Sequence, residues 1–283
     1  MSLEHVSNSI LSKIDVLGLN NAYIVNNKYL EKLLFNRGLV GKSFIEVCFN
    51  ASVLFFKHFK DEFIYHDNIS ELMLLSKGYY YQFVNSYIQA TGNNLQLNMV
   101  ATKRKKIVRN NVEIEIPYSD ISALTDTIII GDTIASGASI CAAISHYSKR
   151  HKLKKAYIFS YAGSIVGGKR IASFCSQYDI DLTLVYGLAA FGLADNGFDL
   201  SFLHPDTITS EEYILKAKNV YKNKAISVIG VDFGTQSQSI KKYSNLCWLE
   251  RQYWDSDDDV FPVYDSNVDS DLLSKEISAF NCK

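Results

Sequence analysis

A run of small residues between a strand and a helix is the part of this sequence best suited to hold an anion. Ile128–Ile130 is a β-branched run, Gly131–Ser139 follows it with two glycines and two serines, and helical spacing of apolar residues resumes at Ile140. Backbone N–H groups in such a loop, together with the partial positive charge of the helix N-terminus, favour a phosphate. We therefore predict a phosphate site formed by Thr133, Ala135, Ser136, Gly137, Ala138 and Ser139. The alternative is an ordinary strand-to-helix turn capped by a serine or an aspartate.

Asp132 is the one charged residue in this loop. A carboxylate adds nothing to an anion site unless it binds something else, and two ribose hydroxyls or a magnesium-bound water would suit it. Either ligand would explain why a carboxylate stands in this loop. If it binds no sugar, it is a cap of the loop.

Basic residues at two other places could neutralise further negative charge. Lys77 follows the apolar run 72–75 and precedes Gly78, at the carboxyl end of a strand, where open α/β sheets bind ligands. The run Lys103, Arg104, Lys105, Lys106 and Arg109 lies in an expected loop over residues 102–111 between strands at 95–101 and 112–116. Such a loop suits a mobile lid over a leaving group, although a solvated edge would carry the same charges.

Strands alternate with helices along the middle of the chain. The apolar patterns predict strands at 72–75, 127–130, 156–161 and 182–186, and helices at 43–57, 81–91, 140–147, 165–177 and 210–220. This order indicates βαβ units and a parallel sheet with helices on its faces. A further strand is expected at 225–230, ahead of an aromatic and acidic tail.

Composition excludes several classes of protein. Of 283 residues, 47% are apolar and 21% charged, which is globular usage. The formal net charge of −1 gives no general attraction to nucleic acid or an anionic membrane, and we expect neither as a partner. Five scattered cysteines without CxxC spacing argue against a disulfide framework or a zinc site. The histidines show no spacing typical of a metal site or a catalytic triad, so we expect no metal site formed by the protein itself. The scattered cysteines are typical of reduced cytosolic thiols, so we expect a cytoplasmic protein.

Residues 128–139 resemble the 5-phosphoribosyl-1-pyrophosphate (PRPP) motif of type I phosphoribosyltransferases. The resemblance implies that Asp132 contacts the ribose and acts in catalysis by stabilising positive charge that develops on the sugar ring. The uracil phosphoribosyltransferases are the most similar branch, because further segments follow in the same order from Ser43 to Gly234. Residues 74–78 resemble the pyrophosphate loop, with Lys77 where arginine is usual. Residues 101–105 resemble the segment from which an arginine reaches PRPP, here Arg104, and residues 112–121 resemble the returning hood strand.

The same resemblance indicates a nucleobase pocket. Residues 196–198 resemble the Asn-Gly-Tyr of the uracil pocket and residues 231–234 its Gly-Asp-Ala-Gly. The base-binding residues implied are Asn196, Gly197, Phe198, Asp232 and Gly234. This chain departs from the family at Gly131, which replaces a usual acidic residue, and in the length of the segment between Phe198 and Asp232. An acceptor other than uracil is therefore compatible with the pattern.

The resemblance implies a fold, an activity and a domain layout. The fold would be a parallel α/β sheet flanked by helices, with a hood hairpin and a C-terminal extension. The layout would be an N-terminal arm (1–42), a phosphoribosyltransferase-like domain (43–235) and the extension (236–283). The enzyme would transfer the phosphoribosyl group of PRPP to a uracil-like pyrimidine or related nitrogen heterocycle, in pyrimidine salvage, and release pyrophosphate. Mg²⁺ would travel with PRPP, and a homodimer is expected.

Two alternatives from other classes remain. A sensor could keep the fold and bind PRPP or a nucleotide without turnover, since the first acidic position and the usual arginine at residue 77 are both replaced. A dinucleotide enzyme of the Rossmann type is disfavoured, because no GxGxxG follows the early strands.

Overall fold

The computed structural model describes residues 9–36, 39, 41–64, 68–75, 77–106, 112–195, 197–221, 223, 225, 227 and 228. Several predicted features lie outside these residues: Arg109, Asn196, Asp232, Gly234, half of the strand expected at 225–230, and the whole extension 236–283.

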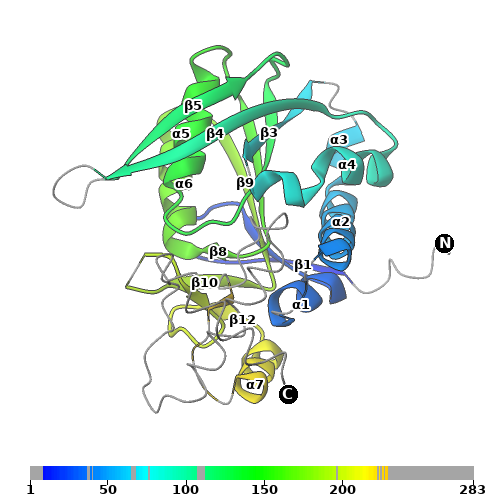
Figure 1. Ribbon diagram of the computed structural model, residues 1–283, viewed down its shortest axis with the longest axis vertical. Coiled ribbons are helices and arrows are strands. Elements are labelled where there is room, and N and C mark those ends of the chain that lie inside the picture. Colours follow the sequence, from blue (N-terminus) through cyan, green and yellow to red (C-terminus); the bar gives the residue numbers. More distant parts are fainter. Residues whose placement is uncertain are drawn as a thin grey trace, which may run out of the picture.

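An eight-stranded sheet forms the centre of the molecule (Figure 1). Its spatial order is β1-β2-β9-β7-β6-β3-β4-β5, with parallel pairing from β2 through β4 and an antiparallel strand at each edge. The strands are β1 (Ile10–Lys13), β2 (Ala22–Asn26), β3 (Ile69–Leu75), β4 (Gln96–Lys106), β5 (Val112–Asp120), β6 (Thr127–Gly131), β7 (Lys155–Ser160) and β9 (Asp181–Gly187). The predicted fold class, a mostly parallel α/β sheet flanked by helices, is confirmed.

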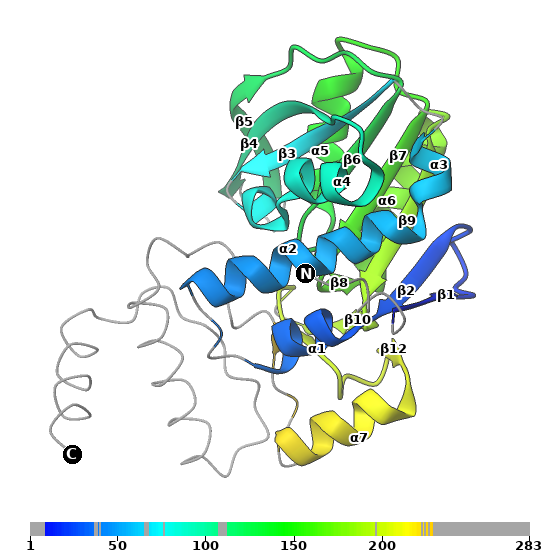
Figure 2. The same cartoon turned by 90° about the vertical axis from the view of Figure 1, so that its right-hand side faces the viewer.

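Helices cover both faces of this sheet (Figures 1 and 2). One face packs against α2 (Gly41–His58), α4 (Phe83–Thr91) and the short helices α3 (Lys60–Ile64) and η2 (Lys77–Tyr81), and the other against α5 (Ala138–Ser148) and α6 (Ile165–Gln177). Because side chains alternate along a strand, Ile129 joins an aromatic core on the first side. Its neighbours Ile128 and Ile130 join an aliphatic core on the second side.

A smaller sheet lies beyond the carboxyl ends of the parallel strands. It consists of β8 (Gly163–Ser164), β10 (Ala189–Leu193), β11 (Leu200–Ser201) and β12 (Ile208–Thr209). Two helices accompany it, α1 (Lys28–Phe35) and α7 (Glu211–Val220), and they contact each other through an ion pair of Glu31 with Lys216 (Figure 2). A bridge between Ile134 and Gly163 connects the small sheet to the loop after β6.

Two predicted boundaries differ from the structure. The described part of residues 1–42, expected as an N-terminal arm, contributes β1 and β2 to the large sheet, because the short apolar run of β2 pairs in parallel with β9. The loop expected over 102–111 is shorter than that, since β4 continues to Lys106 and β5 begins at Val112. Lysine and arginine side chains on an edge hairpin remain in water, so their charge does not end the strand.

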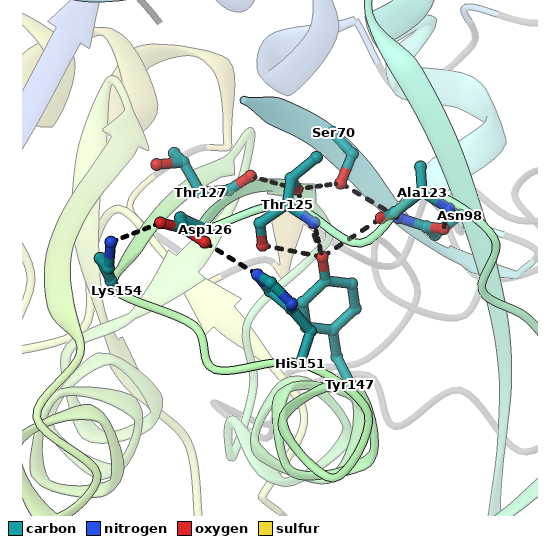
Figure 3. A network of polar contacts seen from close by, with 9 residues as sticks. All are labelled: Ser70, Asn98, Ala123, Thr125, Asp126, Thr127, Tyr147, His151 and Lys154. Atoms are coloured by element: carbon teal, nitrogen blue, oxygen red, sulfur yellow. Dashed lines mark hydrogen bonds and ion pairs between the residues drawn. The ribbon is translucent and has the colours of Figure 1, made fainter. Parts of the chain in front are cut away.

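Polar side chains fix the other end of β6 (Figure 3). Buried Asn98 accepts the backbone N–H groups of Ser122 and Ala123, and the Tyr147 hydroxyl accepts the Thr125 N–H at 2.6 Å. His151 and Lys154 both contact the Asp126 carboxylate. This network holds the connection from β5 to β6 in place and is remote from the loop that follows β6.

Candidate functional site

The predicted phosphate loop lies where β6 ends and α5 begins. Gly137 forms the N-cap of α5 with a left-handed φ of 74°. A Cβ atom on Gly137 would lie 2.6 Å from the Gly167 carbonyl oxygen, and one on Gly167 would lie 2.3 Å from the Ala135 oxygen. Arg170 of α6 also donates to the Ser136 carbonyl oxygen, at 3.2 Å. Gly137 is therefore required for the close packing of the loop against α6, whatever the loop binds.

Gly131 is the position where the resemblance led us to expect an acidic residue. A Cβ atom here would lie 2.6 Å from Cγ of Tyr81 and 2.8 Å from Cζ of Phe83. The Tyr81 ring is buried and stacks on Tyr161, with centroids 3.9 Å apart and planes inclined by 5°. Aromatic rings thus fill the space that a side chain at residue 131 would need.

A cavity of about 320 Å³ opens in front of this loop. It is lined by Leu74, Leu75, Lys77, Thr102, Arg104, Asp132, Thr133, Ala135, Ser136, Gly137, Ala138, Ser139, Ile140 and Phe198. Every residue predicted to bind PRPP is among them except Gly78, which is buried in η2 and packs on Met73. Of the two described residues predicted for the base, Phe198 lines the cavity and Gly197 does not.

Asp132 is the carboxylate of this cavity, with 8% of its surface exposed. Its Oδ1 atom accepts the Thr133 backbone N–H at 2.8 Å. Burial raises the pKa of Asp132 to about 6, although the charge of Lys77, the Thr133 hydrogen bond and the charge of Arg104 act in the opposite direction. The carboxylate is therefore poorly solvated, and two cations lie close enough to act on it.

Only part of the basic run reaches the cavity. The register of β4 against β5 shifts between Ala101 and Lys103, where Thr102 lies opposite two residues of β5, Ile116 and Pro117, so the extra residue belongs to β5. Thr102 and Arg104 line the cavity. Lys105 instead pairs with Glu115 at 2.9 Å, and Lys103 alternates with Arg104 along the strand. The Arg104 guanidinium lies 5.0 Å from the centroid of the Phe198 ring.

Sequence reasoning missed four of the lining residues. These are Leu74, Leu75, Thr102 and Ile140. The leucines end β3 beside Lys77, and Ile140 lies in the first turn of α5. Their positions next to predicted site residues were the available signal.

Among known proteins, the chain is similar to several solved structures at low sequence identity. No family model and no curated protein matches the chain. The AQ2163 protein of Aquifex aeolicus is similar with a TM-score of 0.44 and 16% identity, over 62% of this chain and 95% of that one. A hypoxanthine phosphoribosyltransferase from Staphylococcus aureus has a TM-score of 0.36 and 12% identity, over 50% and 77%. An adenine phosphoribosyltransferase from Saccharomyces cerevisiae has a TM-score of 0.32 and 17% identity, over 50% and 78%.

The chemistry of the cavity follows from its own residues. Its described lining offers hydroxyl and backbone donors along the loop, two cations and one carboxylate, without cysteine or histidine. In the part of the chain that the structure describes, no group of three His, Cys, Asp or Glu residues could hold a metal ion. The described helices include none long and apolar enough to cross a membrane. Such a lining suits a phosphorylated ligand that also carries hydroxyl groups.

Proposed function

We propose that this protein is a PRPP-dependent phosphoribosyltransferase that acts on a nucleobase. The observation that supports it is that Asp132, Lys77 and Arg104 line one cavity with the 133–139 loop, and that both cations act on the Asp132 carboxylate. These groups match the two ends of PRPP: the loop suits the 5-phosphate, the cations suit the pyrophosphate, and Asp132 suits the ribose hydroxyls between them.

The reaction breaks the bond between ribose C1 and the pyrophosphate oxygen and forms a bond from C1 to a ring nitrogen of the base. The bonding electron pair leaves with pyrophosphate, and the base gives up its N–H proton. In the proposed site, Lys77 and Arg104 neutralise the departing charge. Asp132 accepts two hydroxyl hydrogen bonds and stabilises the positive charge that develops on the ring.

Mg²⁺ fits this scheme as an ion carried by the substrate. Asp132 is the only carboxylate among the described lining residues, and Mg²⁺ bound to phosphates keeps several water ligands and needs few from the protein. The ion would add positive charge at the pyrophosphate. As the acceptor we propose a uracil-like pyrimidine or a related nitrogen heterocycle, with Phe198 on the base side of the cavity.

A sensor that binds PRPP without turnover is the second candidate. The observation in its favour is Gly131, because the aromatic packing beside it leaves Asp132 as the only carboxylate among the described residues that line the cavity. Binding alone needs the loop and the cations, whereas turnover also needs stabilisation of the ribose cation.

Calorimetry and a turnover assay distinguish the two candidates. PRPP with Mg²⁺ is titrated first, and pyrophosphate release is then measured with a panel of pyrimidines, purines and related heterocycles. Release with one base supports the transferase, binding without release on any base supports the sensor, and absence of PRPP binding contradicts both.

Two variants of adjacent residues control this experiment. Arg104→Ala removes a cation that lines the cavity, and Lys105→Ala removes one that pairs with Glu115 on the other side of the hairpin. Both change the net charge equally. We expect Arg104→Ala to lower kcat/KM by on the order of 100-fold and Lys105→Ala to change it little. Equal losses would show that only the overall charge of the hairpin matters.

A further inference from the structure

Arg104 and Phe198 meet across the candidate site from opposite sheets. Arg104 belongs to β4 of the large sheet, and Phe198 belongs to the loop between β10 and β11 of the small one. The guanidinium carbon lies 5.0 Å from the ring centroid, within the range of a cation–π interaction. Both side chains line the same cavity. The contact therefore connects the edge hairpin to the small sheet at the site itself.

The loop that carries Phe198 is held firmly at its base. The Ala194 N–H donates to the Asp199 carbonyl at 3.0 Å, and the Gly197 N–H donates to the Ala194 carbonyl at 2.8 Å. Gly197 has a φ of 76°, which glycine adopts without strain. The Phe198 ring is 53% exposed, so it is presented to the cavity rather than packed in the core.

Arg104 has less support on its own strand. Among the described residues no carboxylate forms an ion pair with it, in contrast to Lys105, which Glu115 holds. A long arginine side chain loses much rotational freedom when it is fixed. A ring face can hold the guanidinium while its N–H donors remain available for phosphate oxygens.

We propose that Phe198 is a positioning residue for Arg104. This inference rests on the proposed function, and it assigns to Phe198 a role toward the pyrophosphate end of the ligand. The ring holds the guanidinium over the cavity, so that less conformational entropy is lost when Arg104 binds phosphate. A ring that only stacked on the base would affect the acceptor and leave phosphate affinity unchanged.

Calorimetry with Mg²⁺-pyrophosphate tests the proposal, because this probe has neither ribose nor base. The variants are Phe198→Leu, Phe198→Tyr, Arg104→Ala and the double variant Arg104→Ala/Phe198→Leu. We expect Phe198→Leu to weaken binding about two- to fivefold, the size of an exposed cation–π contact, and Phe198→Tyr to keep wild-type affinity. In the Arg104→Ala background, Phe198→Leu should cause no further loss.

The contact itself is followed by NMR without any ligand. The Arg104 Hε signal, assigned by its absence from Arg104→Ala, should shift in Phe198→Leu and stay in place in Phe198→Tyr. An equal loss of affinity from Phe198→Leu with and without Arg104 overturns the inference, and so does an unchanged affinity. If wild-type protein binds neither PRPP nor pyrophosphate, the proposed function fails and the positioning role fails with it. Binding without coupling between the two residues refutes the positioning role alone.

Discussion

The pH dependence of PRPP binding should report the charge on Asp132. With a pKa of about 6 in the free protein, about ten in eleven Asp132 side chains are ionised at pH 7 and about one in eleven at pH 5. Only the ionised form accepts hydrogen bonds from two ribose hydroxyls with both oxygens. The part of PRPP affinity that depends on this carboxylate should therefore fall about tenfold between pH 7 and pH 5.

Asp132→Asn separates this effect from the titration of the ligand's own phosphates. Calorimetry of both proteins at several pH values from 5 to 8 gives the PRPP association constant of wild type divided by that of Asp132→Asn. Protonation of the ligand's phosphates affects both constants equally and cancels in this ratio. We expect the ratio to decrease toward low pH. Pyrophosphate without Mg²⁺ is the control, because it offers Asp132 neither a ribose hydroxyl nor a magnesium-bound water, and a negative carboxylate can only repel it. A PRPP ratio that stays constant with pH would refute the ribose role.

Three further predictions concern stability. Asp132→Asn should raise the free energy of unfolding at pH 7 by at most about 3 kcal/mol. The reason is that burial raises the pKa of Asp132, so the wild type loses stability as pH rises from about 4 to 6. Denaturant titration measures the difference, and a variant less stable than wild type would contradict the prediction. Gly137→Ala should lower the free energy of unfolding by more than the roughly 1 kcal/mol expected for Gly92→Ala. Both glycines have positive φ, but nothing lies within 4 Å of a Cβ atom at residue 92, whereas one at residue 137 would contact Gly167. Equal losses of stability in the two variants would exclude the contact with Gly167 as a cause. Glu71 is buried in β3, and burial raises its pKa to about 8, although a backbone contact with Val84 acts in the opposite direction. Wild-type stability should therefore fall between pH 4.5 and 8 by about 1.4 kcal/mol per pH unit relative to Glu71→Gln, and parallel stability curves would contradict this.

The sequence predicted the elements whose apolar pattern is local and strong. The helix expected over 165–177 has those bounds in the structure, and the strand expected over 127–130 extends by one residue. The side chains of this strand face two different cores, which a near-continuous apolar run signals well. The strands at 10–13 and 22–26 were missed, because short runs are stabilised by the neighbours they pair with in the folded sheet rather than by their own pattern.

The part of the candidate site that lies in one continuous segment could be predicted from the sequence, whereas contacts between distant segments could not. The loop 131–139 is one continuous segment, so its place between strand and helix could be inferred from residue types. The choice of Arg104 from five basic residues came from the resemblance, and the structure adds the alternation along β4 that turns Lys105 away. Its contact with Phe198 joins residues from different sheets, and no spacing in the sequence encodes such a pair.

The aromatic core helps to account for the raised pKa of Asp132. Tyr81 fills the space beside Gly131, and its hydroxyl accepts the Tyr161 N–H at 3.1 Å. This layer keeps water from one side of Asp132, and burial is the largest cause of that residue's raised pKa. A second carboxylate at residue 131 would have to ionise in the same poorly solvated place, beside a like charge, which raises a carboxyl pKa further. Among the described residues, one carboxylate that shares its cavity with two cations is therefore the arrangement that this core tolerates. Under the proposed function, both the binding of ribose and the stabilisation of its positive charge would fall to Asp132.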